Sequence, residues 1–205
     1  MTRDKKGFFV NLIPHSGVPL TIILVSFAFA LGGASSNLWF RYDRDAIMDG
    51  EIWRIITGHF VHLGWKHFIM NIAGLILIWL LFGRLMTTWK WVVCIIVNAL
   101  FISIGFILFN KDLNWYVGLS GVLHGMFVCG AIASIVTGYR AESVLLLLLV
   151  GKLIWEQLQG ALPGSASFAG GDVVVDAHLY GAIIGLVCAA FLVRKKGEVP
   201  AGPGA

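Results

Sequence analysis

Residues 90–109, KWVVCIIVNALFISIGFILF, decide the fold of this chain, because they run for 20 residues with Lys90 as their single charged side chain. A helix of about 20 apolar residues is long enough to cross the hydrocarbon core of a bilayer. The whole chain is 58% hydrophobic and 13% charged, whereas soluble domains are roughly 45–50% apolar and about 25% charged. The chain is therefore predicted to be an integral membrane protein.

Other apolar runs approach the same length. They are residues 18–34, 67–86, 120–138, 143–158 and 173–193. Several are short or interrupted by glycine, so some helices are expected to begin below the membrane surface. No small-x-small cleavage site follows residues 18–34, which favours a first span over a signal peptide. We predict an all-α polytopic membrane protein with six transmembrane helices.

The distribution of Lys and Arg predicts the orientation of these helices. Six spans place both termini on one side, and that side holds nine of the 15 basic residues. Basic residues concentrate on the cytoplasmic side of membrane proteins. We therefore expect a cytoplasmic segment at 1–17, a membrane domain at 18–193 and a cytoplasmic, disordered tail at 194–205. The net charge of +4 reflects this topology, and no basic stripe indicates a nucleic-acid partner.

The long outside segment, residues 35–66, is not an ordinary loop. Its second half leads into the sequence GEIWRIITGHFVHLGWKHFIMN (50–71), which mixes tryptophan with arginine and histidine. Tryptophan beside polar groups is typical of the membrane interface. We expect short helices that lie partly embedded in the outer leaflet without crossing it.

Polar residues inside the spans indicate chemistry, because an unpaired polar group in hydrocarbon costs several kcal/mol. His67 and Asn71 are four residues apart and share one helix face. Ser120 begins the fourth span, and His178 begins the sixth. Glycine stripes accompany both residues, at 121 and 125 on one span and at 181 and 185 on the other. Small residues let helices approach closely, so the serine and the histidine can come within hydrogen-bond reach.

This arrangement fits nucleophilic catalysis. A serine hydroxyl needs a base, and histidine serves as one near neutral pH. The oxyanion of the tetrahedral intermediate needs fixed donors, for which the Ser120 backbone N–H, Asn71 and His67 are candidates. Gly118 and Gly121 flank the serine and leave room for a substrate chain. Taken singly, a serine at a helix start is more often an N-cap, and a lone buried histidine is more often a packing residue.

The ordered set of motifs resembles the rhomboid family of intramembrane serine proteases. The set is WR (53–54), H59, H62, H67 and N71, then GLSGVLHG (118–125), then AHLYGAIIG (177–185). The resemblance covers roughly residues 50–190. It implies that Ser120 is the nucleophile, His178 the base, and His67 and Asn71 the oxyanion residues. It also implies a structural role for Trp53 and Arg54 in the first outside loop.

One position departs from the commonest rhomboid pattern. Many rhomboids carry an aromatic residue four positions after the serine, where this chain has His124. The short chain and the GLSGVLHG sequence look like the rhombosortase branch. That resemblance implies substrates with a C-terminal Gly-Gly motif, an apolar helix and a basic cluster, and transfer of the acyl group to water or to an amine, which an amine-bearing lipid would supply. It also implies a bacterial inner membrane with the active site open to the periplasm, and no cofactor.

Several neighbouring residues leave alternatives open. His124 lies on the face of Ser120, so it is a second candidate for the base, although we favour His178 and expect His124 to shape the substrate pocket or to bond His178. Lys152 and Glu156 are spaced as a self-satisfied i, i+4 pair. Asp176 is expected to cap the sixth span. These assignments predict a Ser–His dyad without a third acid.

Three other functions are alternatives to a protease. His59, His62 and His67 are dense enough to suggest a metal enzyme, but no HExxH and no carboxylate accompanies them. A catalytically inactive rhomboid relative that binds client proteins would not need the full set of site residues. A transporter is not supported, because neither an intramembrane carboxylate nor a broken-helix pair in the sequence indicates one. We expect no metal site.

Overall fold

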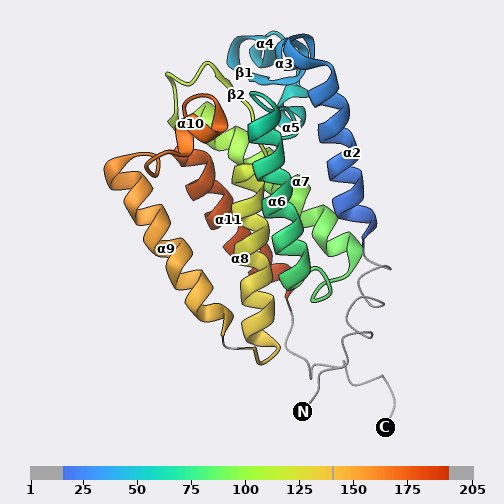
Figure 1. The fold of residues 1–205 in the computed structure, drawn as a ribbon, viewed down its shortest axis with the longest axis vertical. Helices are drawn as coiled ribbons and strands as arrows, with labels where there is room; N and C mark the ends of the chain where they lie inside the picture. The colour runs from blue at the N-terminus through green and yellow to red at the C-terminus, as the bar shows by residue number, and fades with distance from the viewer. Residues whose placement is uncertain (1–15, 140, 194–205) are drawn as a thin grey trace.

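The computed structural model describes residues 16–139 and 141–193, and these residues are mainly helical. Six long helices stand side by side (Figure 1). They are α2 (Gly17–Leu31), α6 (Trp65–Phe82), α7 (Thr88–Phe109), α8 (Ser120–Val136), α9 (Glu142–Gln159) and α11 (Val175–Leu192). Each coincides with one of the six predicted runs, and the all-α polytopic membrane fold is confirmed. The segment before residue 16 and the tail from 194 onward lie outside the described residues.

Length and composition single out some of these helices as membrane spans. Within the described residues, α6, α7 and α11 are long and apolar enough to cross a bilayer. A fourth span results if α2 is counted together with α3 (Gly33–Phe40), to which it is bent by 112°. α8 is shorter, at 17 residues, and α9 contains Glu142, Lys152 and Glu156. Two of these charges, Lys152 and Glu156, belong to the site described below.

Short elements cover one end of the helix bundle. α3, α4 (Arg44–Met48) and α5 (Arg54–Thr57) follow one another at the upper end in Figure 1. This confirms the prediction of short helices in the outside segment, while their depth in the membrane remains a prediction. The sequence did not predict the two-residue strands β1 (Tyr42–Asp43) and β2 (Trp115–Tyr116), which pair antiparallel. That pairing fastens the outside segment to the chain just before α8.

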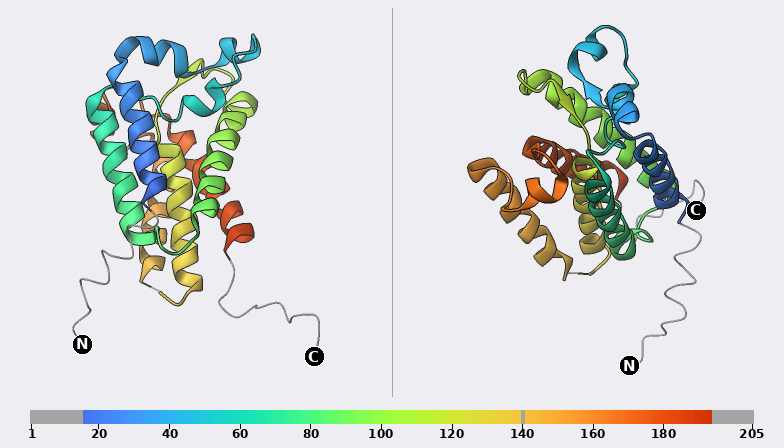
Figure 2. Two further views of the ribbon diagram at one scale, coloured as in Figure 1. Left: turned by 90° about the vertical axis from the view of Figure 1, so that its right-hand side faces the viewer. Right: turned by 45° about the horizontal axis from the view of Figure 1, so that its top comes forward.

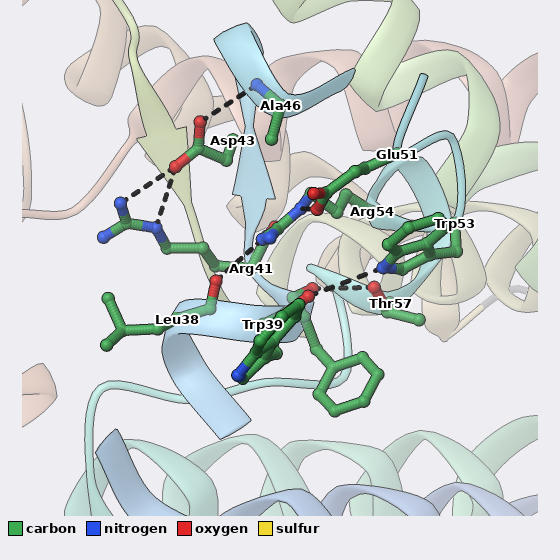
Figure 3. A network of polar contacts seen from close by, with 10 residues as sticks. Leu38, Trp39, Arg41, Asp43, Ala46, Glu51, Trp53, Arg54 and Thr57 are labelled. Atoms are coloured by element: carbon green, nitrogen blue, oxygen red, sulfur yellow. Dashed lines mark hydrogen bonds and ion pairs between the residues drawn. The ribbon is translucent and has the colours of Figure 1, made fainter. Parts of the chain in front are cut away.

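Arg54 holds the short elements together from inside. Its buried guanidinium pairs with Glu51 at 2.5 Å and donates to the carbonyl oxygens of Leu38 and Arg41. Figure 3 shows these bonds together with the one from Thr57 Oγ1 to the Phe40 carbonyl, which is 2.7 Å long. A guanidinium offers five donors in a rigid fork, so one side chain satisfies backbone groups from several turns. The structural role expected of Arg54 agrees with this network.

His59 ties the same segment to α7. Its Nε2 lies 3.0 Å from Ser103 Oγ, and that hydroxyl donates to the Ile55 carbonyl at 2.7 Å. The imidazole is fully buried, and this burial lowers the pKa of His59 to about 4. The ring is therefore neutral at physiological pH and acts as a structural hydrogen-bonding group.

α8 lies at the centre of the bundle and packs against α6, α7, α9 and α11. Figure 2 shows it enclosed by the other long helices. Its contact with α11 runs through glycine on both sides: a Cβ atom on Gly181 would collide with the Gly121 carbonyl oxygen, and one on Gly185 with that of Gly125. The predicted glycine stripes therefore meet directly, backbone against backbone.

Candidate active site

Ser120 and His178 meet where α8 and α11 begin. The Ser120 Oγ lies 2.9 Å from His178 Nε2. Ser120 is half-buried and His178 is buried. The alternative of an N-cap serine is not what the structure shows, because Leu119 holds the cap position and the hydroxyl faces the imidazole. The glycine stripes set this distance, since Gly121 brings α8 against the Ala177 backbone, next to His178.

A tight turn places the serine beside His67. Gly118 has φ +131°, which side chains rarely tolerate. A Cβ atom there would lie 2.8 Å from the His67 ring. The Leu63 N–H donates to His67 Nδ1 at 3.4 Å, so the proton of a neutral ring sits on Nε2, the atom facing this turn. His67 therefore offers an N–H close to the nucleophile, as an oxyanion donor must.

Asn71 lies one turn further along α6. It is buried, and its Nδ2 donates to the His67 carbonyl at 3.2 Å. An amide nitrogen carries two hydrogens, so one donor remains beside that bond. The predicted pair shares one helix face, with His67 at the turn before α8 and Asn71 deeper in the bundle.

A cavity of about 510 Å³ opens beside the nucleophile. Its walls are formed by Leu63 and His67, by residues 112–117 with Ser120, and by residues 169–174. The last of these segments follows α10 (Ser165–Ala169). The cavity lies at the end of the bundle that carries α3, α4 and α5 (Figure 1). A peptide in this cavity would reach Ser120 and His67 together.

His124 is directed away from the hydroxyl. Its Nδ1 lies 2.7 Å from the Ser120 backbone oxygen, so this nitrogen carries a proton and donates it. Its ring stacks on His178, with centroids 4.2 Å apart and planes 15° apart. The structure thus brings His178, and not His124, to the Ser120 hydroxyl. His124 takes the stacking place of the aromatic residue found in many rhomboids, and it does not hydrogen-bond His178 as the sequence had suggested.

The Ser–His pair is present, but an acid lies beside it where the sequence predicted none. The two carboxylate oxygens of Glu156 lie 3.1 and 3.0 Å from His178 Nδ1. The predicted ion pair with Lys152 is present at 2.7 Å. Both of its members also contact histidines on neighbouring helices. The i, i+4 spacing identified the pair correctly and could not reveal which neighbouring helix it faces. The signal available in the sequence was a carboxylate inside an apolar run, which requires a partner.

Asp176 does not cap α11. Val174 holds the cap position, and the Asp176 carboxylate accepts a hydrogen bond from Asn110 Nδ2 at the end of α7. Tyr180 Oη donates to the other side of the same amide, at 2.7 Å from Asn110 Oδ1. Asp176 therefore fastens the start of α11 to α7 and leaves the histidine to Glu156.

The described residues contain one group whose His, Cys, Asp or Glu ligand atoms are close enough to share a metal ion. It consists of His124, Glu156 and His178, with atoms within 4.8 Å of one another. The ammonium of Lys152 already lies among them, 2.7 Å from Glu156 and 2.9 Å from His124 Nε2. Of the three histidines considered for a metal enzyme, His59 lies on Ser103, His67 lies at the turn before α8, and His62 packs its ring against His67 and Phe68.

Comparison with known proteins adds independent information. Residues 49–195 match the Rhomboid domain family. A protein named Rhomboid protease GlpG from Yersinia enterocolitica is 29% identical over 200 residues, which cover 93% of this chain and 68% of that relative. The protein of the same name from Salmonella typhimurium is 27% identical over 176 residues, which cover 84% of this chain and 60% of the relative. The chain thus spans about two thirds of the length of these relatives.

Proposed function

The chain belongs to the rhomboid family, and we propose that it is an intramembrane serine protease that cuts membrane-anchored exported proteins beside their transmembrane helix. The observation that carries the proposal is the 2.9 Å contact between Ser120 Oγ and His178 Nε2 in a buried, glycine-packed setting. A hydroxyl bonded to an imidazole nitrogen is the arrangement of an activated serine nucleophile. The chain is a serine endopeptidase with a rhomboid-type Ser–His pair.

The reaction follows from the positions of these groups. Ser120 Oγ attacks the scissile carbonyl carbon while His178 Nε2 accepts the hydroxyl proton. The negative oxygen that forms is stabilised by His67, Asn71 and the Ser120 backbone N–H. His178 then gives its proton to the leaving amine, and an acyl-enzyme on Ser120 remains. Water or an amine attacks this ester while His178 accepts its proton, and His178 returns that proton to Ser120 Oγ as the bond between the acyl carbon and Oγ breaks.

Within the family we assign the chain to the rhombosortase type. Support comes from the GLSGVLHG sequence and from His124, which stacks on His178 where other rhomboids carry an aromatic ring. The substrates of this type carry a Gly-Gly motif before an apolar helix and a basic cluster. Glycine disfavours a helix interior by about 1 kcal/mol relative to alanine, so a Gly-Gly pair leaves its helix easily. Gly118 and Gly121 serve packing, because the His67 ring fills the space beside the first and the Ala177 backbone the space beside the second.

The proposed setting is the bacterial inner membrane, with both termini in the cytoplasm and the active site open to the periplasm. The excess of Lys and Arg on the side of the termini supports this orientation. So does the arrangement of the bundle, because α2 begins and α11 ends at the end opposite to α3, α4 and α5 (Figure 1). The basic cluster of a substrate would stay in the cytoplasm and bring its glycines to the outer face. The acyl acceptor is water or the amine of a lipid headgroup.

Two experiments test the proposal. A fluorophosphonate probe should label the wild-type protein in membranes and should not label the Ser120→Ala variant. Loss of labelling in His178→Ala, with His124→Ala still labelled, would assign the base. Labelling that survives Ser120→Ala contradicts the assignment of Ser120 as the nucleophile, and a folded wild-type protein that is not labelled would leave a client-binding relative.

The substrate class is tested by co-expression with an exported protein that carries such a tail. We expect the tail to be removed, and replacing its two glycines with leucine to prevent removal. Equal cleavage of both tails would leave a general rhomboid protease with other transmembrane substrates.

A further inference from the structure

α9 meets the active site through two charged side chains, Lys152 and Glu156. Of its residues, Leu153 and Glu156 are buried. Glu156 is 3% exposed although it is a carboxylate in an apolar helix. A buried charge of this kind is paired or has a function. Glu156 has two partners, the Lys152 ammonium on its own helix and the His178 imidazole on α11.

The hydrogen-bond pattern fixes which tautomer of His178 can act as a base. Nε2 must be unprotonated to accept the Ser120 proton, so Nδ1 must carry the hydrogen. Glu156, at 3.0 and 3.1 Å, is an acceptor for that hydrogen. The Lys152 ammonium lies 3.3 Å from the same Nδ1, but an ammonium has only donors. Glu156 therefore favours the reactive tautomer, and Lys152 alone would favour the unreactive one.

Lys152 in turn orients the side chains of Glu156 and His124 by hydrogen-bonding both. Its Nζ lies 2.7 Å from Glu156 Oε2 and 2.9 Å from His124 Nε2. Because His124 Nδ1 donates to the Ser120 backbone, its Nε2 is a free acceptor for the ammonium. The same lysine thus steadies the carboxylate and the ring that stacks on His178.

We propose that Glu156, held by Lys152, is a positioning residue that orients His178 and stabilises its imidazolium, so that the Ser–His pair works as a Ser–His–Glu triad. This inference rests on the proposed protease function. The proton on His178 Nδ1 stays there while Nε2 accepts and releases the reacting proton, and the carboxylate stays ionised, as in soluble serine proteases with an acid behind the histidine. α9 then contributes to catalysis, besides contributing to the wall of the bundle.

The key variant is Glu156→Gln, which keeps shape and removes charge. Lys152 would take the amide oxygen, and the amide N–H₂ would face His178 Nδ1 and force the unreactive tautomer. In serine proteases such a change lowers kcat by about 10⁴. We expect kcat to fall by at least about 10³ and KM to stay within about threefold, because Glu156 does not line the cavity. Glu142→Gln, at the far end of α9, is the matched control and should keep wild-type kinetics.

A double variant separates positioning from a merely structural ion pair. In Lys152→Met/Glu156→Gln no ammonium claims the amide oxygen, so the amide can turn and accept from His178 Nδ1–H. We expect kcat at least about tenfold above that of Glu156→Gln alone. No recovery in a folded double variant, or a Glu156→Gln variant within about fivefold of wild-type kcat, would overturn the proposal.

A spectroscopic measurement tests the proposal independently of activity. In protein labelled with ¹⁵N-histidine, the ring nitrogens of His178 should report Nδ1–H in the wild type and Nε2–H in Glu156→Gln. The signals are assigned by their loss in His178→Ala, since the chain has six histidines. The same tautomer in both proteins would contradict the role of Glu156. A wild-type protein that shows Nδ1–H but cleaves nothing would instead count against the protease function.

Discussion

His178 lies on α11 and is contacted by α9, and these two helices are packed in opposite ways. α11 contacts α8 through glycines, so that backbone touches backbone. α11 buries eight of its 18 residues, whereas α9 buries two of its 18. α11 thus places His178 by close packing, and α9 adjusts it by charge. The contact between α11 and α8 has no room for added atoms. The contact between α9 and His178 depends on a few polar atoms. The predictions below test this difference.

The largest effect is expected where α8 and α11 touch. Gly181→Val would drive its side chain into the Gly121 carbonyl oxygen. Overpacking a tight core typically costs 1–3 kcal/mol, and a clash with backbone costs more. We expect a loss of more than about 3 kcal/mol in unfolding free energy, together with loss of labelling by the fluorophosphonate probe. Thermal unfolding in detergent measures the first quantity, and unchanged stability would refute the close packing described here.

The next effect concerns α6, which packs against α8. Removing one oxyanion donor typically lowers kcat by about 10²–10³. We expect Asn71→Ala to do so with little change in KM, because an oxyanion donor acts on charge that develops only in the transition state. Steady-state cleavage of a tail substrate provides both constants. A change confined to KM would make Asn71 a substrate-binding residue.

On the charged side, Lys152→Met should destabilise the protein by leaving Glu156 buried without its cation. Breaking a fully buried ion pair costs about 3–5 kcal/mol. The lysine side chain is 26% exposed, so we expect a smaller loss, about 2–3 kcal/mol. Adding Glu156→Gln should restore much of this stability, since no buried charge then remains. A double variant less stable than Lys152→Met would contradict this electrostatic origin.

The burial of His59 against α7 predicts how the stability of the protein depends on pH. Its pKa is lowered from 6.5 to about 4 by burial, so below pH 6.5 the unfolded chain binds a proton that the folded protein excludes. Stability is therefore full above pH 6.5 and falls as the pH drops toward 4, by on the order of 3 kcal/mol from this residue. Unfolding of wild type and His59→Gln between pH 7 and 4 measures the difference. Parallel curves would exclude this contribution.

The smallest effect is expected on α9 itself. Nothing lies within 4 Å of a Cβ atom on Gly151. Gly151→Ala should therefore raise stability by up to about 1 kcal/mol, the helix-propensity difference between the two residues. Gly181→Ala, the same change on α11, should lower it. If both substitutions act in the same direction, the contrast between α9 and α11 is wrong.

Hydropathy predicted the long helices because each membrane helix carries its signal in its own residues. Ser120 and His178 could also be placed, since glycine at 121, 125, 181 and 185 indicates close helix contact. Glu156 could not be assigned to His178, because its spacing specifies the partner on its own helix and leaves the neighbouring helix open. The predicted capping role of Asp176 was wrong for the same reason, because its partner Asn110 is distant in sequence.

At 1.5 Å per residue, the 17 residues of α8 extend about 26 Å, less than the hydrocarbon thickness of about 30 Å. Because the other long helices enclose α8, it can begin inside the thickness of the bilayer while its first backbone groups stay buried in protein. Ser120 is the first residue of that helix. Lipid chain length therefore sets how deep the nucleophile lies, and longer acyl chains should slow the entry of water and substrate to it.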